Sequence, residues 1–70
     1  MTGAEIQRLE QYLQKTFRMK GIEVRQRHKK DDSVEVFIDG EFIGVIYRDE
    51  EDDEVSYQFQ MAILAYDLEE

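Results

Sequence analysis

Two spacings of apolar residues divide the chain at Gly21. Before this glycine, apolar residues recur every three or four positions, the spacing of one helix face, at Ile6, Leu9, Leu13 and Phe17. Thr2 and Glu5 stand in the positions of a capping box, in which each side chain accepts a hydrogen bond from the other residue's backbone. Gly21 itself can adopt the positive φ that ends a helix. The pattern predicts an α-helix over residues 3–20.

Beyond Gly21 apolar residues alternate with polar ones, as in half-buried β-strands. Asp39 and Gly40 lie between two apolar runs, which is the strongest short-range signal for a hairpin with a type I′ turn. That turn sets a register in which Phe37 faces Phe42. In the same register Val36 faces Ile43 and Val34 faces Val45, and one face of the hairpin carries Val34, Val36, Ile38, Ile43, Val45 and Tyr47. We expect this face to lie under the helix.

The same alternation extends the sheet in both directions. Pairing Val24 with Val36 keeps both on the core face and sets Arg25 against Glu35 on the other side. Pairing Tyr47 with Val55 continues the core face into Tyr57, Phe59, Met61 and Ile63. The predicted fold is α+β: one N-terminal helix packed on a four-stranded antiparallel meander, in two layers. We expect residues 1–70 to form a single domain.

A second group of apolar residues falls on the sheet face opposite the helix. Phe37, Phe42 and Ile46 point to that side, and the last strand outruns its partner, which places Ala62, Leu64 and Tyr66 there as well. An exposed apolar face next to an unpaired strand end is typical of an interaction surface. The alternatives are that the end of the chain folds back, turns helical or closes onto the first strand.

Charge is unevenly distributed along the chain. The sequence holds 9 Lys and Arg against 17 Asp and Glu, a formal net charge of −8. Residues 1–30 carry eight bases and three acids, whereas residues 31–70 carry one base and fourteen acids. A chain this acidic is repelled from nucleic acid and from anionic lipid, so neither is an expected partner. Solubility through self-repulsion explains the imbalance most simply. The alternative is a dipolar surface that docks on a charged partner or on a second copy of the chain.

Composition and motifs exclude several further classes. Without cysteine the chain has no disulfide, thiolate nucleophile or cysteine-ligated zinc. No stretch approaches the roughly 18 apolar residues of a membrane-spanning helix, and the N-terminus lacks the apolar region of a signal peptide, so we expect a cytoplasmic protein. The serines lie outside any nucleophile elbow, and Gly40 and Gly44 flank a hairpin strand, not a phosphate-binding turn. We expect no enzyme activity and no cofactor, and Gly44 indicates a bulge or a tight aromatic contact.

Two charged runs are weaker candidates for binding. A basic patch on the first strand and its turn comprises Arg25, Arg27, His28, Lys29 and Lys30. With Phe37 on the same face, it faintly resembles the mixture of cations and aromatics in single-strand binders, although acidic neighbours interrupt it. The acidic run over residues 49–54 offers oxygen ligands for a divalent cation but lacks the spacing of an EF-hand loop. A solvated hairpin tip explains that run more simply.

Three stretches of the chain resemble one known family. They are Lys29-Lys30-Asp31-Asp32-Ser33-Val34-Glu35-Val36, Gly40-Glu41-Phe42-Ile43-Gly44-Val45 and Phe59-Gln60-Met61-Ala62-Ile63-Leu64. Together they are similar to a small family of alphaproteobacterial proteins known only as a domain of unknown function. The resemblance covers nearly the whole chain and implies a bacterial cytoplasmic protein made of this domain alone. It implies no activity, cofactor or catalytic residue.

The sequence therefore predicts a non-enzymatic interaction or regulatory protein. We expect a homodimer, or a complex with another protein, formed through Phe37, Phe42, Ile46 and the end of the last strand. The alternatives from other classes are weak nucleic-acid binding at the basic patch and weak divalent-cation binding at the acidic tip.

Overall fold

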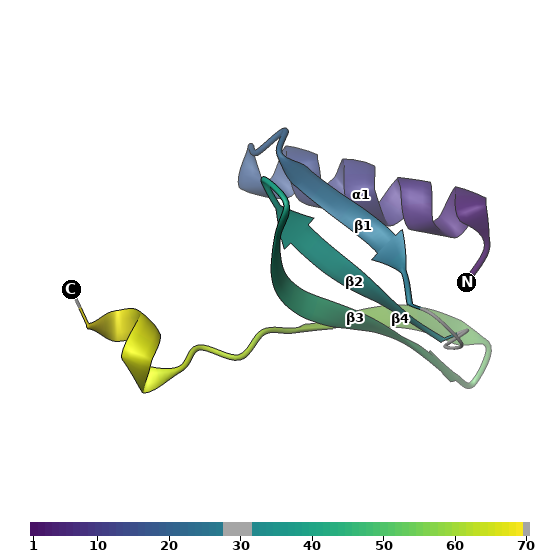
Figure 1. Ribbon diagram of the computed structural model, residues 1–70. Helices are drawn as coiled ribbons and strands as arrows, with labels where there is room; N and C mark the ends of the chain where they lie inside the picture. Colours follow the sequence, from purple (N-terminus) through teal and green to yellow (C-terminus); the bar gives the residue numbers. More distant parts are fainter. Residues whose placement is uncertain (28–31, 70) are drawn as a thin grey trace.

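One helix lies across one face of a four-stranded antiparallel sheet (Figure 1). The computed structural model describes residues 1–27 and 32–69. Its elements follow the predicted order: helix α1 (Gly3–Phe17), strands β1 (Ile22–Gln26), β2 (Ser33–Ile38), β3 (Glu41–Glu51) and β4 (Glu54–Gln60), and a 3₁₀ turn η1 (Ala65–Leu68). The strands are neighbours in chain order, β1-β2-β3-β4, so the α+β meander is confirmed.

Helix α1 begins as predicted and ends three residues early. The Thr2 hydroxyl accepts a hydrogen bond from the Glu5 N–H, and the Glu5 carboxylate accepts one from the Thr2 N–H, which completes the capping box. The helix stops at Phe17 because Arg18 adopts a left-handed conformation at φ 55°. Gly21 has a different role: a Cβ there would collide with the Asp39 carboxylate, so the glycine leaves room for this side chain of the β2–β3 turn.

The first hairpin turn and the β1–β2 register agree with the sequence. Asp39 and Gly40 both have positive φ, at 50° and 85°, as a type I′ turn requires. Val24 lies opposite Val36, and Arg25 lies opposite Glu35. The alternation in β1 and β2 therefore predicted both the pairing and the faces.

A bulge changes the register of β3. Phe37 lies opposite Phe42 as predicted, but Val36 lies opposite Gly44 instead of Ile43. The extra residue reverses the faces of the rest of the strand, because successive side chains point to opposite sides of a sheet. Ile46 is consequently on the helix side and only 2% exposed, so its predicted place on the outer face is wrong.

The same reversal moves Val45 and Tyr47 from the predicted core face to the outer face of the sheet. Opposite them, β4 is shifted by three residues from the prediction, because β3 runs on to a two-residue turn at Asp52 and Asp53. Tyr47 therefore pairs with Gln58 and not with Val55. A shift of the β3–β4 pairing by an odd number of residues also changes which β4 side chains share a face with a given β3 residue. This shift and the β3 bulge cancel each other, so the β4 residues predicted to lie on the helix side do lie there.

The core is small and lies between α1 and the first three strands. Its buried apolar side chains are Leu13, Ile22, Val24, Val34, Val36 and Ile46. The helix packs mainly against β1 and reaches β4 only through a side chain at its first turn (Figure 1). Every residue of β4 is exposed, including Tyr57 and Phe59 at 37% each. One half of the helix-side face is thus bare.

The last strand, which was predicted to run on through Ala62, Leu64 and Tyr66, ends early, at Gln60. Beyond it, residues 61–69 (the C-terminal segment) leave the sheet and run away from the rest of the molecule before the η1 turn (Figure 1). The bulge explains where β4 ends: β3 bends towards β2 at Gly44, and Val45–Gln60 is the last pair of the β3–β4 ladder. Of the alternatives left open, a helical turn is what residues 65–68 form.

Candidate interaction site

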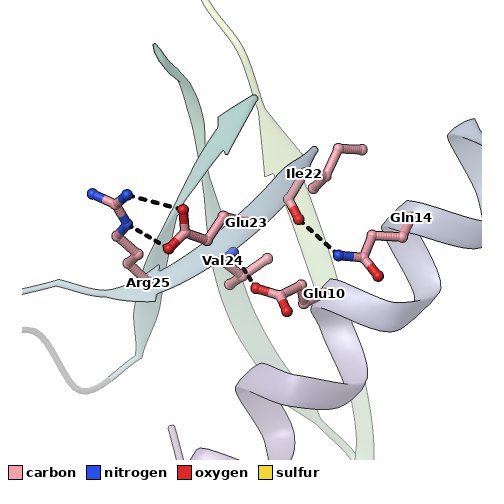
Figure 2. Close-up of polar contacts among 6 residues, drawn as sticks. All are labelled: Glu10, Gln14, Ile22, Glu23, Val24 and Arg25. Carbon is pink, nitrogen blue, oxygen red and sulfur yellow. Dashed lines mark hydrogen bonds and ion pairs between the residues drawn. The ribbon is translucent and has the colours of Figure 1, made fainter. Parts of the chain in front are cut away.

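The outer face of the sheet, opposite α1, carries an ordered aromatic pair. The rings of Phe37 and Phe42 meet edge to face, with centroids 5.7 Å apart. The guanidinium of Arg25 lies over the Phe37 ring, 4.2 Å from its centroid. The Glu23 carboxylate accepts two hydrogen bonds from the same guanidinium, at 2.9 and 3.1 Å (Figure 2). Phe37 is therefore covered by Arg25, whereas Phe42 remains 52% exposed.

Next to Phe42, the outer face and the C-terminal segment enclose a groove of about 510 Å³. We call this the outer groove. It forms where β3 bends away from the end of β4, so the C-terminal segment supplies one of its walls. Its lining includes Phe42, Val45, Tyr47, Gln60, Ala62 and Leu64. The groove is mostly apolar, and the acidic residues Glu41 and Asp67 are also part of its lining.

The groove brings together half of the predicted interface. Phe42, Ala62 and Leu64 all line it, although the last two reach it from an irregular segment and not from a strand. Phe37 lies beside Phe42, outside the groove. Tyr66 is 79% exposed on η1, and Ile46 lies in the core. Sequence reasoning missed Val45 and Tyr47, because only the bulge brings them to this face.

A second apolar groove lies on the helix-side face, beyond the end of α1. This inner groove has a volume of about 190 Å³. All its lining side chains are apolar; they are Leu13, Phe17, Met19, Ile22, Val36, Ile38, Ile43, Phe59 and Met61. Phe17, Met19 and Met61 are 40–52% exposed. Met61 lines both grooves and joins them at the end of β4.

The two edge strands of the sheet, β1 and β4, differ in whether their outward backbone groups have hydrogen-bond partners. Along the edge formed by β1, the Glu10 carboxylate accepts a hydrogen bond from the Val24 N–H, and the Gln14 amide donates one to the Ile22 carbonyl, both at 2.9 Å (Figure 2). Two helix side chains thus occupy backbone groups that an edge strand would otherwise leave unpaired. The hydrogen bonds among the described residues include none to the free edge of β4.

A polar cluster ties the start of α1 to the far half of the sheet. The Glu5 carboxylate accepts a hydrogen bond from the Tyr57 hydroxyl and lies 2.9 Å from Nε of Arg48. A second nitrogen of the Arg48 guanidinium, Nη2, lies 3.0 Å from the Glu50 carboxylate. The Tyr57 hydroxyl, helped by the Thr2 N–H and the Arg48 charge, lowers the pKa of Glu5. The same hydrogen bond raises the pKa of Tyr57. Because these residues are remote in sequence, alternation gave no sign of the cluster.

The basic patch is only partly described. His28, Lys29 and Lys30 lie outside the described residues. Arg25 is engaged by Glu23 and Phe37, and Nη1 of Arg27 donates a hydrogen bond to the buried Ser33 hydroxyl at 3.2 Å. Arg25 therefore already occupies one face of the Phe37 ring, so the described geometry does not favour stacking of a nucleic-acid base there.

The acidic run forms the tip of the β3–β4 hairpin. Asp52 and Asp53 make the turn with φ of 51° and 67°, and the flanking carboxylates continue along the two strands. Side chains alternate between the two faces of a hairpin, which separates neighbouring carboxylates. Among residues 1–27 and 32–69, no three acidic or histidine side chains are grouped closely enough to hold a metal ion.

The chain belongs to a family of unknown function. The family described as "Protein of unknown function (DUF3126)" matches residues 5–67, from the first turn of α1 to η1. No curated protein and no solved structure is significantly similar to the chain. Within the described residues, no helix has the length and apolar character needed to cross a bilayer.

Proposed function

We propose that this chain is a non-enzymatic protein–protein interaction domain that associates with a second copy of itself through the outer groove. The observation that carries the proposal is the convergence of Phe42, Val45 and Tyr47 with the apolar C-terminal segment around one groove. Contiguous exposed apolar surface rimmed by polar residues is typical of contact sites. We also propose that the domain acts in the cytoplasm of an alphaproteobacterium, and the resemblance of its sequence to such a family supports this.

Solution mass measured by sedimentation equilibrium tests the proposal. We expect a dimer whose mass changes little between low and high salt, because apolar contacts are not screened as charges are. Replacing Phe42 by Asp puts a charge beside the groove, and we expect a folded monomer by circular dichroism and mass.

Tyr12→Asp is the matched control for this experiment. Tyr12 is 64% exposed on α1, away from the outer groove, so the same change of an aromatic to an acid should leave the dimer intact. A Phe42→Asp protein with the mass of the unmodified chain would contradict the proposed site. A dimer that dissociates in salt would point instead to pairing of basic and acidic surfaces.

A further inference from the structure

The molecule has a larger solvent-accessible surface than a compact monomer of the same mass. A compact monomer of 8.4 kDa has an accessible surface of roughly 4,600 Å² by the scaling of monomeric proteins, whereas this chain exposes 5887 Å². The excess of about 1,300 Å² exceeds the approximately 800 Å² that each partner buries in a stable interface of standard size. The fold therefore has enough spare surface for one complete dimer interface.

Most exposed apolar side chains of that surface lie on β4 and the C-terminal segment. Within the segment, four large side chains are at least 60% exposed; they are Ile63, Leu64, Tyr66 and Leu68. The alternation of β4 continues through Met61 and Ile63, past the last residue that β3 pairs. The segment thus has the pattern of a strand and, among the described residues, no strand beside it.

Only one of the two edges of the sheet is available for pairing with an added strand. Glu10 and Gln14 occupy the β1 edge, whereas the hydrogen bonds within the described part of the chain include none to the outer edge of β4. A two-fold axis pairs that edge antiparallel with the same edge of another copy, so one surface serves as both halves of the contact. Antiparallel pairing also separates the two acidic hairpin tips, which parallel pairing would bring side by side.

We propose that two copies pair antiparallel along the end of β4 and residues 61–64, with the two-fold axis at Met61. This inference rests on the proposed self-association and specifies its geometry. Each C-terminal segment becomes an added strand on the partner's β4. Ile63 then faces the partner's Phe59 on the helix side, and Gln60 faces the partner's Ala62 on the outer side. The bare halves of the two helix-side faces, each with its inner groove, then lie next to each other between the two helices, because edge pairing extends the sheet in its own plane.

Cysteine cross-linking tests this register, since the chain has no cysteine of its own. Residues directly opposite across a two-fold axis have Cα atoms about 4.5–5.5 Å apart, within the range of a disulfide. We expect oxidised Met61→Cys protein to run mainly as a covalent dimer on a non-reducing gel. Ser56→Cys on β4 and Gln11→Cys on α1 are matched exposed controls, and both should stay monomeric on that gel.

A mixing experiment tests the same geometry without changing Met61, which lines both grooves. Gln60→Cys and Ala62→Cys should each form little covalent dimer alone. Oxidising an equimolar mixture of the two should give mainly the mixed disulfide, which mass spectrometry distinguishes from either homodimer.

The outcomes separate this proposal from the proposed function. A dimeric solution mass that Phe42→Asp abolishes, with cross-linking at Ser56 or at no tested position near Met61, would overturn the strand pairing and leave the proposed function standing. A monomeric mass at all concentrations would overturn both.

Discussion

Gly44 has no room for a side chain because the end of β4 lies directly against it. A Cβ built on this residue would lie 2.5 Å from the Gln60 carbonyl oxygen and 2.7 Å from a ring carbon of Phe59. The carbonyl belongs to the backbone of a paired strand, so it cannot move without disturbing the ladder. The single missing side chain therefore lets β3 bulge while β4 stays attached.

Gly44→Ala should consequently destabilise the protein. We expect a loss of about 1–3 kcal/mol in the free energy of unfolding, the usual range for overpacking. Urea denaturation followed by circular dichroism measures it. Gly3→Ala is the matched control, since nothing lies within 4 Å of a Cβ there, and it should change stability by less than about 1 kcal/mol. Equal effects at the two positions would contradict the close approach of β4.

Glu5 makes stability depend on pH in a defined direction. Its pKa is lowered from the ordinary 4.5, above all by the Tyr57 hydroxyl. A depressed carboxyl pKa contributes stability that is present above the unfolded-state value and is lost as pH falls through the folded-state value. We expect the unmodified protein to have a higher Tm than Glu5→Gln at pH 7, and the difference to disappear well below pH 4.5. A difference that stays constant down to pH 2 would show that the carboxylate charge contributes nothing.

At the scale of elements, the sequence predicted what depends on alternation and turn residues. Helix α1, the Asp39–Gly40 turn and the β1–β2 register all follow from local signals, and the structure confirms them. The β3 faces could not be predicted, because residues 42–46 form an unbroken run with no polar residue to distinguish one side. Gly44 indicated a bulge, but it did not specify which residue is the extra one.

Half of the candidate site could be predicted, because the turn register fixes the residues before the bulge but not those after it. Phe42 precedes the bulge and lies where the turn register puts it, whereas Ile46 follows the bulge and lies in the core. Ala62 and Leu64 reach the outer groove although the strand that was expected to carry them has ended. The contacts of Glu10 and Gln14 with β1 depend on how the helix packs, which periodicity does not reveal.

The contact between Glu10 and β1 can be tested on its own. Glu10→Ala removes the acceptor for the Val24 N–H, and a part-buried donor left without its partner costs about 1–3 kcal/mol. Glu10→Gln keeps a carbonyl oxygen in place and should cost less. Hydrogen exchange at the Val24 amide, followed by NMR, should speed up in the alanine variant and change little in the glutamine variant. Unchanged exchange in both would mean that the carboxylate does not hold this edge.

At the scale of the whole molecule, shape and charge distribution are linked. The chain measures 44 × 24 × 23 Å, and its radius of gyration of 13.0 Å exceeds the roughly 11 Å of a compact 70-residue domain. The long dimension comes from the C-terminal segment at one end and the acidic hairpin at the other (Figure 1). The acidic run over residues 49–54 therefore lies at the opposite end of the molecule from the C-terminal segment, where its repulsion between two copies is weaker.

The unequal edges of the sheet also limit how far assembly can go. A subunit with two open edges can add neighbours on both sides and grow into a fibre, whereas a subunit with one open edge is used up once that edge is paired. Because Glu10 and Gln14 close the β1 side, pairing at β4 ends in a finite complex of two chains. The two hydrogen bonds from α1 to β1 would then prevent a further copy from adding at the β1 edge. Without them, the protein would polymerise instead of stopping at a dimer.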